Sequence, residues 1–327
     1  MYEQALHKTP VENKRFLVTG GAGFIGSNIT EYLLQHGAKV RVFDNLATGN
    51  IENLREFKTN PNFEFFEGDL RKVEDCVNAC KEIDAVCHQA AIGSVPRSIK
   101  DPVTSNDVNV GGFVNMLTAA KDAGIKRFVY ASSSSVYGDE PNLPKKEERI
   151  GNPLSPYAVT KFTNEVYASV FARCYDLELI GLRYFNVFGP KQDPYGEYAA
   201  VMPLFIKGLL EDEAPYVNGD GEQTRDFTFV HNAVQANILG LTTDNPAAFN
   251  QAYNVAFGER FTINQMYEAI KNYLKKDINA IHRDPRAGDI RDSLADISKA
   301  HNLLGYSPQY SFKQGLPLTI EYFKKVF

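Results

Sequence analysis

The chain has 327 residues, 43% of them hydrophobic, and this length favours one large domain with a smaller one appended, or two domains. Its 35 basic and 40 acidic residues are well mixed and leave a net charge of −5, so we expect no binding to nucleic acid or to a membrane surface. The four cysteines form no CxxC pair and no histidine stands at a zinc-ligand spacing, which favours free thiols, no metal site and a reducing compartment. No apolar run approaches the ~18 residues of a membrane-spanning helix, and the polar start of the chain lacks a signal-peptide core. A cytoplasmic protein is therefore expected.

Apolar, β-rich runs alternate with helical patterns through the first 190 residues. Such alternation predicts an α/β fold with a doubly wound parallel sheet and helices on both faces, of the Rossmann type. Ligands of these sheets gather at the carboxyl ends of the strands. The expected strands are RFLVTG (15 to 20), KVRVFD (39 to 44), FEFFEGD (63 to 69), AVCHQA (85 to 90), RFVYASS (127 to 133) and LELIGLRYF (177 to 185).

After about residue 190 the regular alternation of strands and helices ends. Shorter elements follow, separated by Pro and Gly, as in GPKQDPYGEY, NGDGEQTRDF and RDPRAGDIRD. This part is predicted to form a smaller C-terminal domain for the substrate, and a helix over 231–241 and the strand QAYNV are expected to return to the first domain. The predicted division is an N-terminal extension over 1–13, a first domain over 14–190 with 231–255, and a second over 191–230 and 256–327.

A glycine-rich turn, TGGAGFIG, follows the first strand and opens a helix near Phe24. Gly20, Gly23 and Gly26 satisfy GxxGxxG, and glycine alone permits both a tight turn and close approach of the backbone to a phosphate. The amides at the helix start point at a pyrophosphate. Asp44 lies 18 residues after Gly26, where a carboxylate accepts from the adenosine ribose and repels a 2′-phosphate, so NAD is favoured over NADP.

Other strand ends fall on the same rim of the sheet. Asp69 suits the adenine side, and the small Ala90 and Ala91 permit close passage of the cofactor. Asn109, on the following helix, is expected to brace the loop near the site. The cofactor-binding candidates beyond the three glycines and Asp44 are Phe24, Ile25, Asn45, Thr48, Gly49, Asp69, Leu70, Gln89, Ala90, Ala91, Asn109, Tyr157, Lys161 and Tyr184.

The segment SPYAVTK places Lys161 four residues after Tyr157, on one helix face. A tyrosine with a pKa near ~10 becomes a base at neutral pH only if a nearby cation stabilises the phenolate. The spacing by itself proves little, because Tyr267 and Lys271 repeat it on an amphipathic helix. Tyr157 differs because YASSSSVYG, a strand end with four serines, precedes it and supplies a hydroxyl for the substrate oxygen. These residues predict a catalytic triad on the cofactor rim.

Together, TGGAGFIG, ASSSSVYG, SPYAVTK and LRYFNVFGP resemble the extended short-chain dehydrogenase/reductase family, and within it the nucleotide-sugar 4-epimerases, over nearly the whole chain. QAAIGSVPRS, QDPYGEYAAVMP, NGDGEQTRDF and AGDIRDSLADISKA are most similar to the bacterial UDP-N-acetylglucosamine 4-epimerases of surface-polysaccharide synthesis. The resemblance implies an NAD-binding Rossmann domain, a UDP-sugar-binding domain, and a homodimer that pairs helices over about 101–123 and 155–175.

The resemblance also implies a mechanism. Tyr157 takes the proton of the sugar 4-hydroxyl while C4 gives a hydride to NAD, and the 4-keto sugar then rotates and receives the same hydride on its other face. Lys161 lowers the pKa of Tyr157 and grips the ribose. Ser133 is the catalytic serine by the family pattern, although the run of four serines leaves this open by one position. The dehydratases carry an Asp-Glu pair where this chain has Ser134 and Ser135, so dehydration is disfavoured.

For the substrate, the family positions make Arg225 and Arg286 the clamp on the pyrophosphate, since arginine binds phosphate oxygens in pairs. Asp289 would take the uridine ribose. A small residue in the segment after RxGD, here Ser293, would leave space for an N-acetyl group. The substrate-binding candidates are Gly93, Ser94, Ser133, Ser134, Asn186, Gln192, Ala200, Val201, Tyr216, Asn218, Arg225, Arg286, Asp289 and Ser293.

Three alternatives stay open. The first is another sugar for the same enzyme, either UDP-glucose and UDP-galactose or UDP-glucuronate, whose carboxylate would need a cation such as Arg97. The second is a non-catalytic NAD-sensing regulator of the same fold, against which the intact Ser133, Tyr157 and Lys161 argue. The third is a net dehydrogenase that releases NADH.

Overall fold

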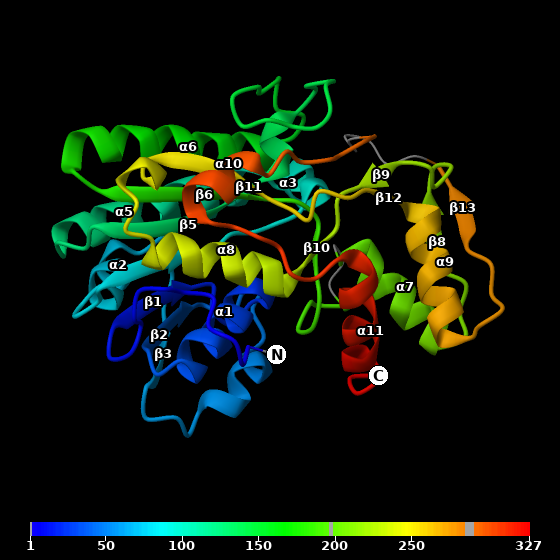
Figure 1. Ribbon diagram of the computed structural model, residues 1–327, viewed down its shortest axis with the longest axis horizontal. Coiled ribbons are helices and arrows are strands. Elements are labelled where there is room, and N and C mark those ends of the chain that lie inside the picture. The colour runs from blue at the N-terminus through cyan, green and yellow to red at the C-terminus, as the bar shows by residue number, and fades with distance from the viewer. Residues whose placement is uncertain (1, 196–198, 285–290) are drawn as a thin grey trace.

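The computed structural model describes residues 2–195, 199–284 and 291–327, and its larger part is a sheet layered between helices (Figure 1). Seven parallel strands form the sheet in the order β11-β6-β5-β4-β1-β2-β3. The expected Rossmann-type fold is confirmed. The strands are β1 (Arg15–Thr19), β2 (Lys39–Asp44), β3 (Phe63–Glu67), β4 (Ala85–His88), β5 (Arg127–Ser133), β6 (Glu178–Tyr184) and β11 (Gln251–Val255).

Helices cover both faces of this sheet, with α6 above it and α8 below it in Figure 1. The strands are apolar on both sides because both faces are buried. In β1, Phe16 and Val18 pack into the core with α1 and α8, whereas Leu17 packs into the core with α2, α5 and α6. The helices around the sheet are α1 (Phe24–Gln35), α2 (Val73–Ala79), α3 (Val95–Lys100), α4 (Pro102–Asn106), α5 (Gly112–Asp122), α6 (Pro156–Tyr175), α8 (Val230–Thr242) and α10 (Ser298–Leu304).

Strand β11 and helix α8 come from the second half of the chain and return to this sheet, as the sequence predicts. β11 pairs in parallel with β6, with Gln251 opposite Ile180 and Val255 opposite Tyr184. α8 is buried along nearly its whole length against the sheet. This arrangement supports the proposed inclusion of 231–255 in the first domain.

The N-terminal segment precedes β1, but it is part of the core rather than an extension outside the fold. Tyr2, Leu6 and Val11 are buried in the same apolar cluster as α1. The Tyr2 hydroxyl donates to Asn28 Oδ1 of α1 at 2.9 Å. The segment is polar on average, and its three buried apolar side chains follow neither a helical nor a strand period, so the pattern gave no sign of their packing.

The smaller part, at the right of Figure 1, surrounds a separate apolar core. Its helices are α7 (Val201–Leu210), α9 (Ile263–Leu274) and α11 (Phe312–Phe323). The chain also forms three separate short strand pairs: β10 (Thr228–Phe229) with β7 (Val187–Phe188), β12 (Phe261–Thr262) with β9 (Thr224–Arg225), and β13 (Ile281–Arg283) with β8 (Tyr216–Asn218). Within the described ranges, no helix is long and apolar enough to cross a membrane.

Candidate active site

A cavity of about 980 Å³ lies along the carboxyl ends of the central strands and beneath the smaller part. All of the cofactor candidates line it except Asn109. It extends to Tyr195 and to Tyr322, Phe323 and Val326 at the C-terminal end of the chain, which sequence patterns alone did not connect with the site. Among the described residues, no group of three or more His, Cys, Asp or Glu side chains could hold a metal ion.

The glycine loop has the geometry that a dinucleotide requires. Gly20 has φ +66°, and a Cβ there would lie 2.7 Å from the backbone of Ala90. A Cβ on Gly26 would lie 2.3 Å from the carbonyl oxygen of Gly20. Gly23, which precedes Phe24 at the start of α1, has no side chain to cap the helix. The amides of the first turn are therefore available to a pyrophosphate, and the residues fit NAD.

Asp44, the last residue of β2, fixes the loop on which the cofactor would rest. Its Oδ2 accepts from the Ala22 amide at 3.0 Å, and its Oδ1 accepts from the Leu46 amide at 2.9 Å. Burial raises the pKa of Asp44, and these amide hydrogen bonds act to lower it. Each carboxylate oxygen has a second lone pair, so Asp44 can still accept from ribose hydroxyls.

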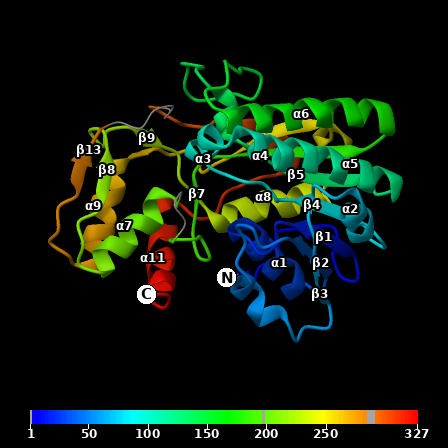
Figure 2. The ribbon, with the colours of Figure 1, turned by 180° about the vertical axis from the view of Figure 1, so that it is seen from behind.

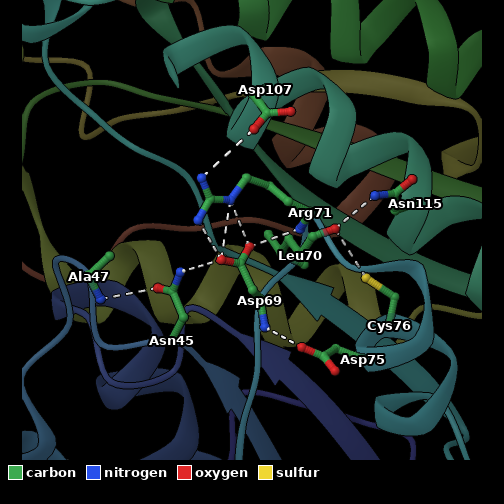
Figure 3. Close-up of polar contacts among 9 residues, drawn as sticks. All are labelled: Asn45, Ala47, Asp69, Leu70, Arg71, Asp75, Cys76, Asp107 and Asn115. Carbon is green, nitrogen blue, oxygen red and sulfur yellow. Dashed lines mark hydrogen bonds and ion pairs between the residues drawn. The ribbon is translucent and has the colours of Figure 1, made fainter. Parts of the chain in front are cut away.

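Asp69 is held by an arginine that the sequence analysis missed (Figure 3). Arg71 Nη2 lies 2.6 Å from Asp69 Oδ2, and Arg71 Nε donates to Oδ1 at 3.1 Å. The Arg71 guanidinium lowers the pKa of Asp69 to about 2. The Asp69 amide donates to Asp75 Oδ2 at 2.9 Å, and Asn45 Nδ2 donates to Asp69 Oδ2 at 3.3 Å. Arg71 lines the cavity and adds a cation at the edge where the adenine was expected. Its position two residues after the strand-end Asp69 was the available signal.

Asn109 braces the site and does not line the cavity. It lies in a π-helical turn, Asp107–Gly111, between α4 and α5. Its Oδ1 accepts from the Ile92 amide at 2.8 Å, and its Nδ2 donates to the Ile92 carbonyl at 3.1 Å and to Thr160 Oγ1 at 3.2 Å. Asn109 thus ties the loop after β4 to helix α6, as the sequence analysis expected of a brace.

Tyr157 and Lys161 lie at the start of α6 and line the cavity. The helix begins after Ser155, whose Oγ accepts from the Ala158 amide at 3.2 Å. The Tyr157 amide donates to Ser98 Oγ at 3.0 Å. Lys161 is 2% exposed, and its Nζ donates to the carbonyl of Ala131 at 2.9 Å and lies 6.0 Å from the centroid of the Tyr157 ring.

Burial controls the acidity of this pair. It raises the pKa of the Tyr157 phenol, and a hydrogen bond with Ser133 lowers it. Burial also lowers the pKa of the Lys161 ammonium to about 8. Burial thus opposes charge on both groups, whereas a phenolate beside an ammonium would be stabilised. The lowering of the Tyr157 pKa by Lys161 stays a prediction.

The serines at positions 132 to 135 have different hydrogen-bond partners. The Ser133 hydroxyl acts to lower the pKa of Tyr157, and its Oγ accepts from the Ser135 amide at 3.1 Å. Ser132 instead donates to Glu165 Oε1 at 2.5 Å. Ser134 and Ser135 lie in a 3₁₀ turn, Ser134–Tyr137. These contacts support Ser133 as the serine that works with Tyr157.

Two of the substrate candidates, Gly93 and Gln192, line the same cavity. Gln192 Nε2 donates to the carbonyl of Val187 at 3.2 Å, and its buried Oε1 has no hydrogen-bond partner among the described residues. A buried acceptor without a partner is costly unless a ligand supplies one. Ser94 lies beside them with φ +101° and caps α3, its Oγ accepting from the Arg97 amide at 3.3 Å. Gln192 is therefore suited to receive a ligand hydroxyl or amide.

Asn186, Arg225 and Ser293 come together in a second group, between the sheet and the smaller part. Asn186 Nδ2 donates to Ser293 Oγ at 3.4 Å, and Ser293 Oγ also accepts from the Asp226 amide at 3.4 Å. Arg225 Nη1 donates to the carbonyls of Thr224 at 2.8 Å and of Arg291 at 3.0 Å. The Ser293 side chain is small, but its hydroxyl already positions these loops.

Four further substrate candidates do not line the cavity: Ala200, Val201, Tyr216 and Asn218. Tyr216 and Asn218 stand on β8, where Arg283 stacks 5.2 Å from the Tyr216 ring and its Nε donates to Asn218 Oδ1 at 2.6 Å. Ala200 and Val201 are at the start of α7. Arg286 and Asp289 lie outside the described residues, so their roles stay predictions.

Known proteins are similar to this chain over nearly its whole length. The NAD dependent epimerase/dehydratase family matches residues 16–256. A putative UDP-glucose 4-epimerase of Methanocaldococcus jannaschii is 38% identical over 94% of this chain and 98% of its own length. The solved UDP-N-acetylglucosamine 4-epimerase of Methanobrevibacter ruminantium, in complex with UDP-N-acetylmuramic acid, has a TM-score of 0.91 and 40% identity over 97% of this chain and 100% of that chain. The UDP-glucuronic acid 4-epimerase of Bacillus cereus, solved with UDP-glucuronic acid and NAD, has a TM-score of 0.90 and 31% identity over 96% of this chain and 100% of that chain.

The family match spans most of the sheet that carries the cavity, and it includes the glycine loop, the four-serine strand end and the Tyr157–Lys161 pair. The relatives match at nearly full length in both directions. This chain therefore belongs to the NAD dependent epimerase/dehydratase family, and it is an enzyme that uses NAD.

Proposed function

We propose that the enzyme reversibly epimerises UDP-N-acetylglucosamine to UDP-N-acetylgalactosamine at C4. The observation that carries the proposal is the Tyr157–Lys161 pair in the lining of a dinucleotide cavity, together with the hydrogen bond by which Ser133 lowers the pKa of Tyr157. Ser134 and Ser135 stand where the dehydratases of the family carry the Asp-Glu pair for the removal of water, which argues against dehydration. The same intact triad argues against a non-catalytic regulator.

Each residue of the site has a separate role in the proposed reaction. The residues that line the cavity would hold NAD, which would supply an acceptor and then a donor for the hydride at C4 of the sugar. Tyr157 accepts the proton of the 4-hydroxyl as a phenolate and returns it as a phenol. Ser133 holds the 4-oxygen, and the Lys161 ammonium stabilises the phenolate at pH values below its pKa of about 8. Since NAD ends unchanged, net release of NADH is not expected.

The choice of an N-acetylated sugar rests on Ser293 and on the comparisons. Ser293 is a small side chain bonded to Asn186 beside the candidate substrate residues. A bulky side chain there would fill space that an acetamido group needs. The M. ruminantium epimerase, which was solved with an N-acetylated UDP-sugar derivative, is among the similar structures and supports this choice.

An assay panel with separate UDP-sugars tests the proposal. We expect UDP-N-acetylglucosamine to have a kcat/KM at least about tenfold above that of UDP-glucose, the discrimination that one well-fitted group supplies. Ser293→Tyr should reverse the order while turnover of UDP-glucose continues, which shows that the variant folds. Absence of turnover of UDP-N-acetylglucosamine by the wild-type enzyme would contradict the proposal.

A second candidate substrate is UDP-glucuronate. Arg97, on helix α3, lines the cavity, where a guanidinium could meet the C6 carboxylate. The B. cereus structure, solved with UDP-glucuronic acid, is also similar to this chain. Preferential turnover of UDP-glucuronate in the same panel, lost in Arg97→Leu, would replace our first choice.

We also propose that two copies of the chain form a dimer through α6 and its neighbours. In Figure 2, α3 and α4 lie beside α6, and these helices are in contact. They expose apolar side chains together, including Val103 at 77%, Val166 at 50% and Val170 at 40%. An exposed apolar patch of this kind is typical of an interface.

Charged side chains introduced into this patch are expected to dissociate the dimer. Val166→Glu combined with Val170→Glu should shift the enzyme to a monomer in sedimentation velocity, because two carboxylates would face apolar surface. Leu318→Glu, at a residue 42% exposed on α11, is the matched control and should leave the dimer intact. A wild-type monomer, or a dimer that survives the double change, would disprove this interface.

A further inference from the structure

Glu165 continues the catalytic face of α6 into the interior. Tyr157, Lys161 and Glu165 follow one another at intervals of four residues, so their side chains project from the same face of the helix. Tyr157 and Lys161 line the cavity, whereas Glu165 does not. The reaction described above gives Glu165 no part.

The Glu165 carboxylate pairs with Arg183 of β6 through two hydrogen bonds. Arg183 Nη2 lies 2.8 Å from Oε2, and Arg183 Nε donates to Oε1 at 2.9 Å. The two side chains are 10% and 3% exposed. Removing both charges from water costs several kcal/mol, and apolar residues in their place are often as stable. Stability alone is therefore a weak reason for this pair.

A third partner joins the pair to the catalytic strand end. Ser132 donates to Glu165 Oε1 at 2.5 Å, and in the sheet Ser132 stands directly opposite Arg183. The neighbours of Ser132 are the two residues that hold the catalytic pair. The carbonyl of Ala131 accepts from Lys161 Nζ, and Ser133 bonds with Tyr157.

Arg183 is itself held from the other side. Its Nη1 donates to the Tyr137 hydroxyl at 3.0 Å and to the carbonyl of Glu147 at 3.0 Å. The Tyr137 hydroxyl donates to Asn254 Oδ1 of β11 at 2.6 Å. The guanidinium thus has partners on α6, on the turn after β5 and at the Glu147 carbonyl, and it has little freedom to move.

We propose that Glu165 and Arg183 are positioning residues, which anchor Ser132 and thereby hold Ser133 and the Ala131 carbonyl in place against Tyr157 and Lys161. The proposal rests on the proposed epimerase function. Without the anchor, the end of β5 shifts, the two contacts lengthen, and the phenolate of Tyr157 loses stabilisation. A misplacement of about 1 Å at a reacting group costs on the order of a hundredfold in rate.

The test uses the full-length enzyme with its bound NAD and the variants Ser132→Ala and Glu165→Gln. We expect Ser132→Ala to lower kcat by roughly ten- to a hundredfold with little change in KM or NAD content. The acid limb of the pH profile of kcat should also move to higher pH, because a phenol with fewer stabilising contacts loses its proton less readily. Glu165→Gln, which keeps the shape but removes the charge, should act in the same direction.

A purely structural role would give a different result. Thr242→Val is the matched control, since it also deletes one buried hydroxyl, which donates to the Ile238 carbonyl on α8 at 2.7 Å, and no residue of α8 lines the cavity. It should lower thermal stability slightly and leave kcat and the pH profile unchanged. If Ser132→Ala behaves like Thr242→Val, the proposal is wrong.

A measurement of the Tyr157 pKa tests the positioning role independently of the proposed epimerase function. Ultraviolet titration of the enzyme and of Tyr157→Phe isolates the ionisation of Tyr157 without any substrate. A higher pKa of Tyr157 in Ser132→Ala supports the positioning role even if the enzyme turns over no UDP-sugar, and an unchanged pKa overturns it. Ser132→Ala leaves the ion pair intact, so the test does not depend on whether Glu165→Gln folds.

Discussion

Tyr157→Phe is expected to lower kcat for 4-epimerisation by roughly 10²- to 10⁴-fold, the usual contribution of a positioned acid and base. The change deletes the phenolic oxygen of Tyr157. Among the described residues, no other side chain bonded to Ser133 can accept the proton of the sugar 4-hydroxyl. The ring remains, so the cavity should keep its shape and NAD should stay bound. Steady-state kinetics and the nucleotide content of the purified variant measure both effects.

Tyr267→Phe is the matched control, because Tyr267 and Lys271 have the same spacing on α9. The Tyr267 hydroxyl donates to the carbonyl of Ile278 at 2.6 Å in the core of the smaller part. Its removal should cost about 1 kcal/mol of the free energy of unfolding and leave kcat unchanged. If Tyr157→Phe stays active while Tyr267→Phe does not, the assignment of the base is wrong.

Gly26→Ala is expected to weaken NAD binding by at least about tenfold, that is by roughly 1.4 kcal/mol or more. The added Cβ would lie 2.3 Å from the Gly20 carbonyl oxygen and 2.8 Å from Gly21 Cα. Both neighbours are backbone atoms, so no side-chain rotation relieves the clash. The start of α1 must then move away from the glycine loop and take its amides with it. Titration of the nucleotide-free protein with NAD measures the loss.

Gly111→Ala provides the comparison for this glycine. A Cβ there would find its nearest atom, Asp107 Oδ1, at 3.6 Å, and its backbone is helical. We expect unchanged NAD affinity and a stability that is equal or up to about 1 kcal/mol higher, since alanine restricts the unfolded chain. Equal NAD affinity in Gly26→Ala and the wild type would refute the proposed pyrophosphate site.

The strands of the large sheet could be predicted because of where they lie. A parallel strand that is buried on both faces reads as a continuous apolar run, and the FLV of β1 shows this directly. The cofactor candidates could be predicted from the same strands, since the carboxyl ends of parallel strands share one edge of the sheet. Asp44 and Gln89, for example, are 45 residues apart in sequence but line one cavity.

The supporting contacts could not be predicted in this way. Nothing in the sequence pairs Arg183 with Glu165, and the position of Arg71 two residues after Asp69 does not by itself show that the two side chains meet. The buried N-terminal Tyr2 is a similar case, because its contact with α1 depends on a surface that exists only after the sheet has formed.

The amino-acid sequence by itself determined the order of strands and helices, the glycine loop, the Tyr157–Lys161 spacing and hence the family. These features are local, because each depends on the periodicity or spacing of neighbouring residues. Only the tertiary structure decided which serine contacts Tyr157, that Ser132 faces Glu165, and that the Ser293 hydroxyl already has partners. Such contacts join residues from different strands and helices, and their distances are set by how those elements pack.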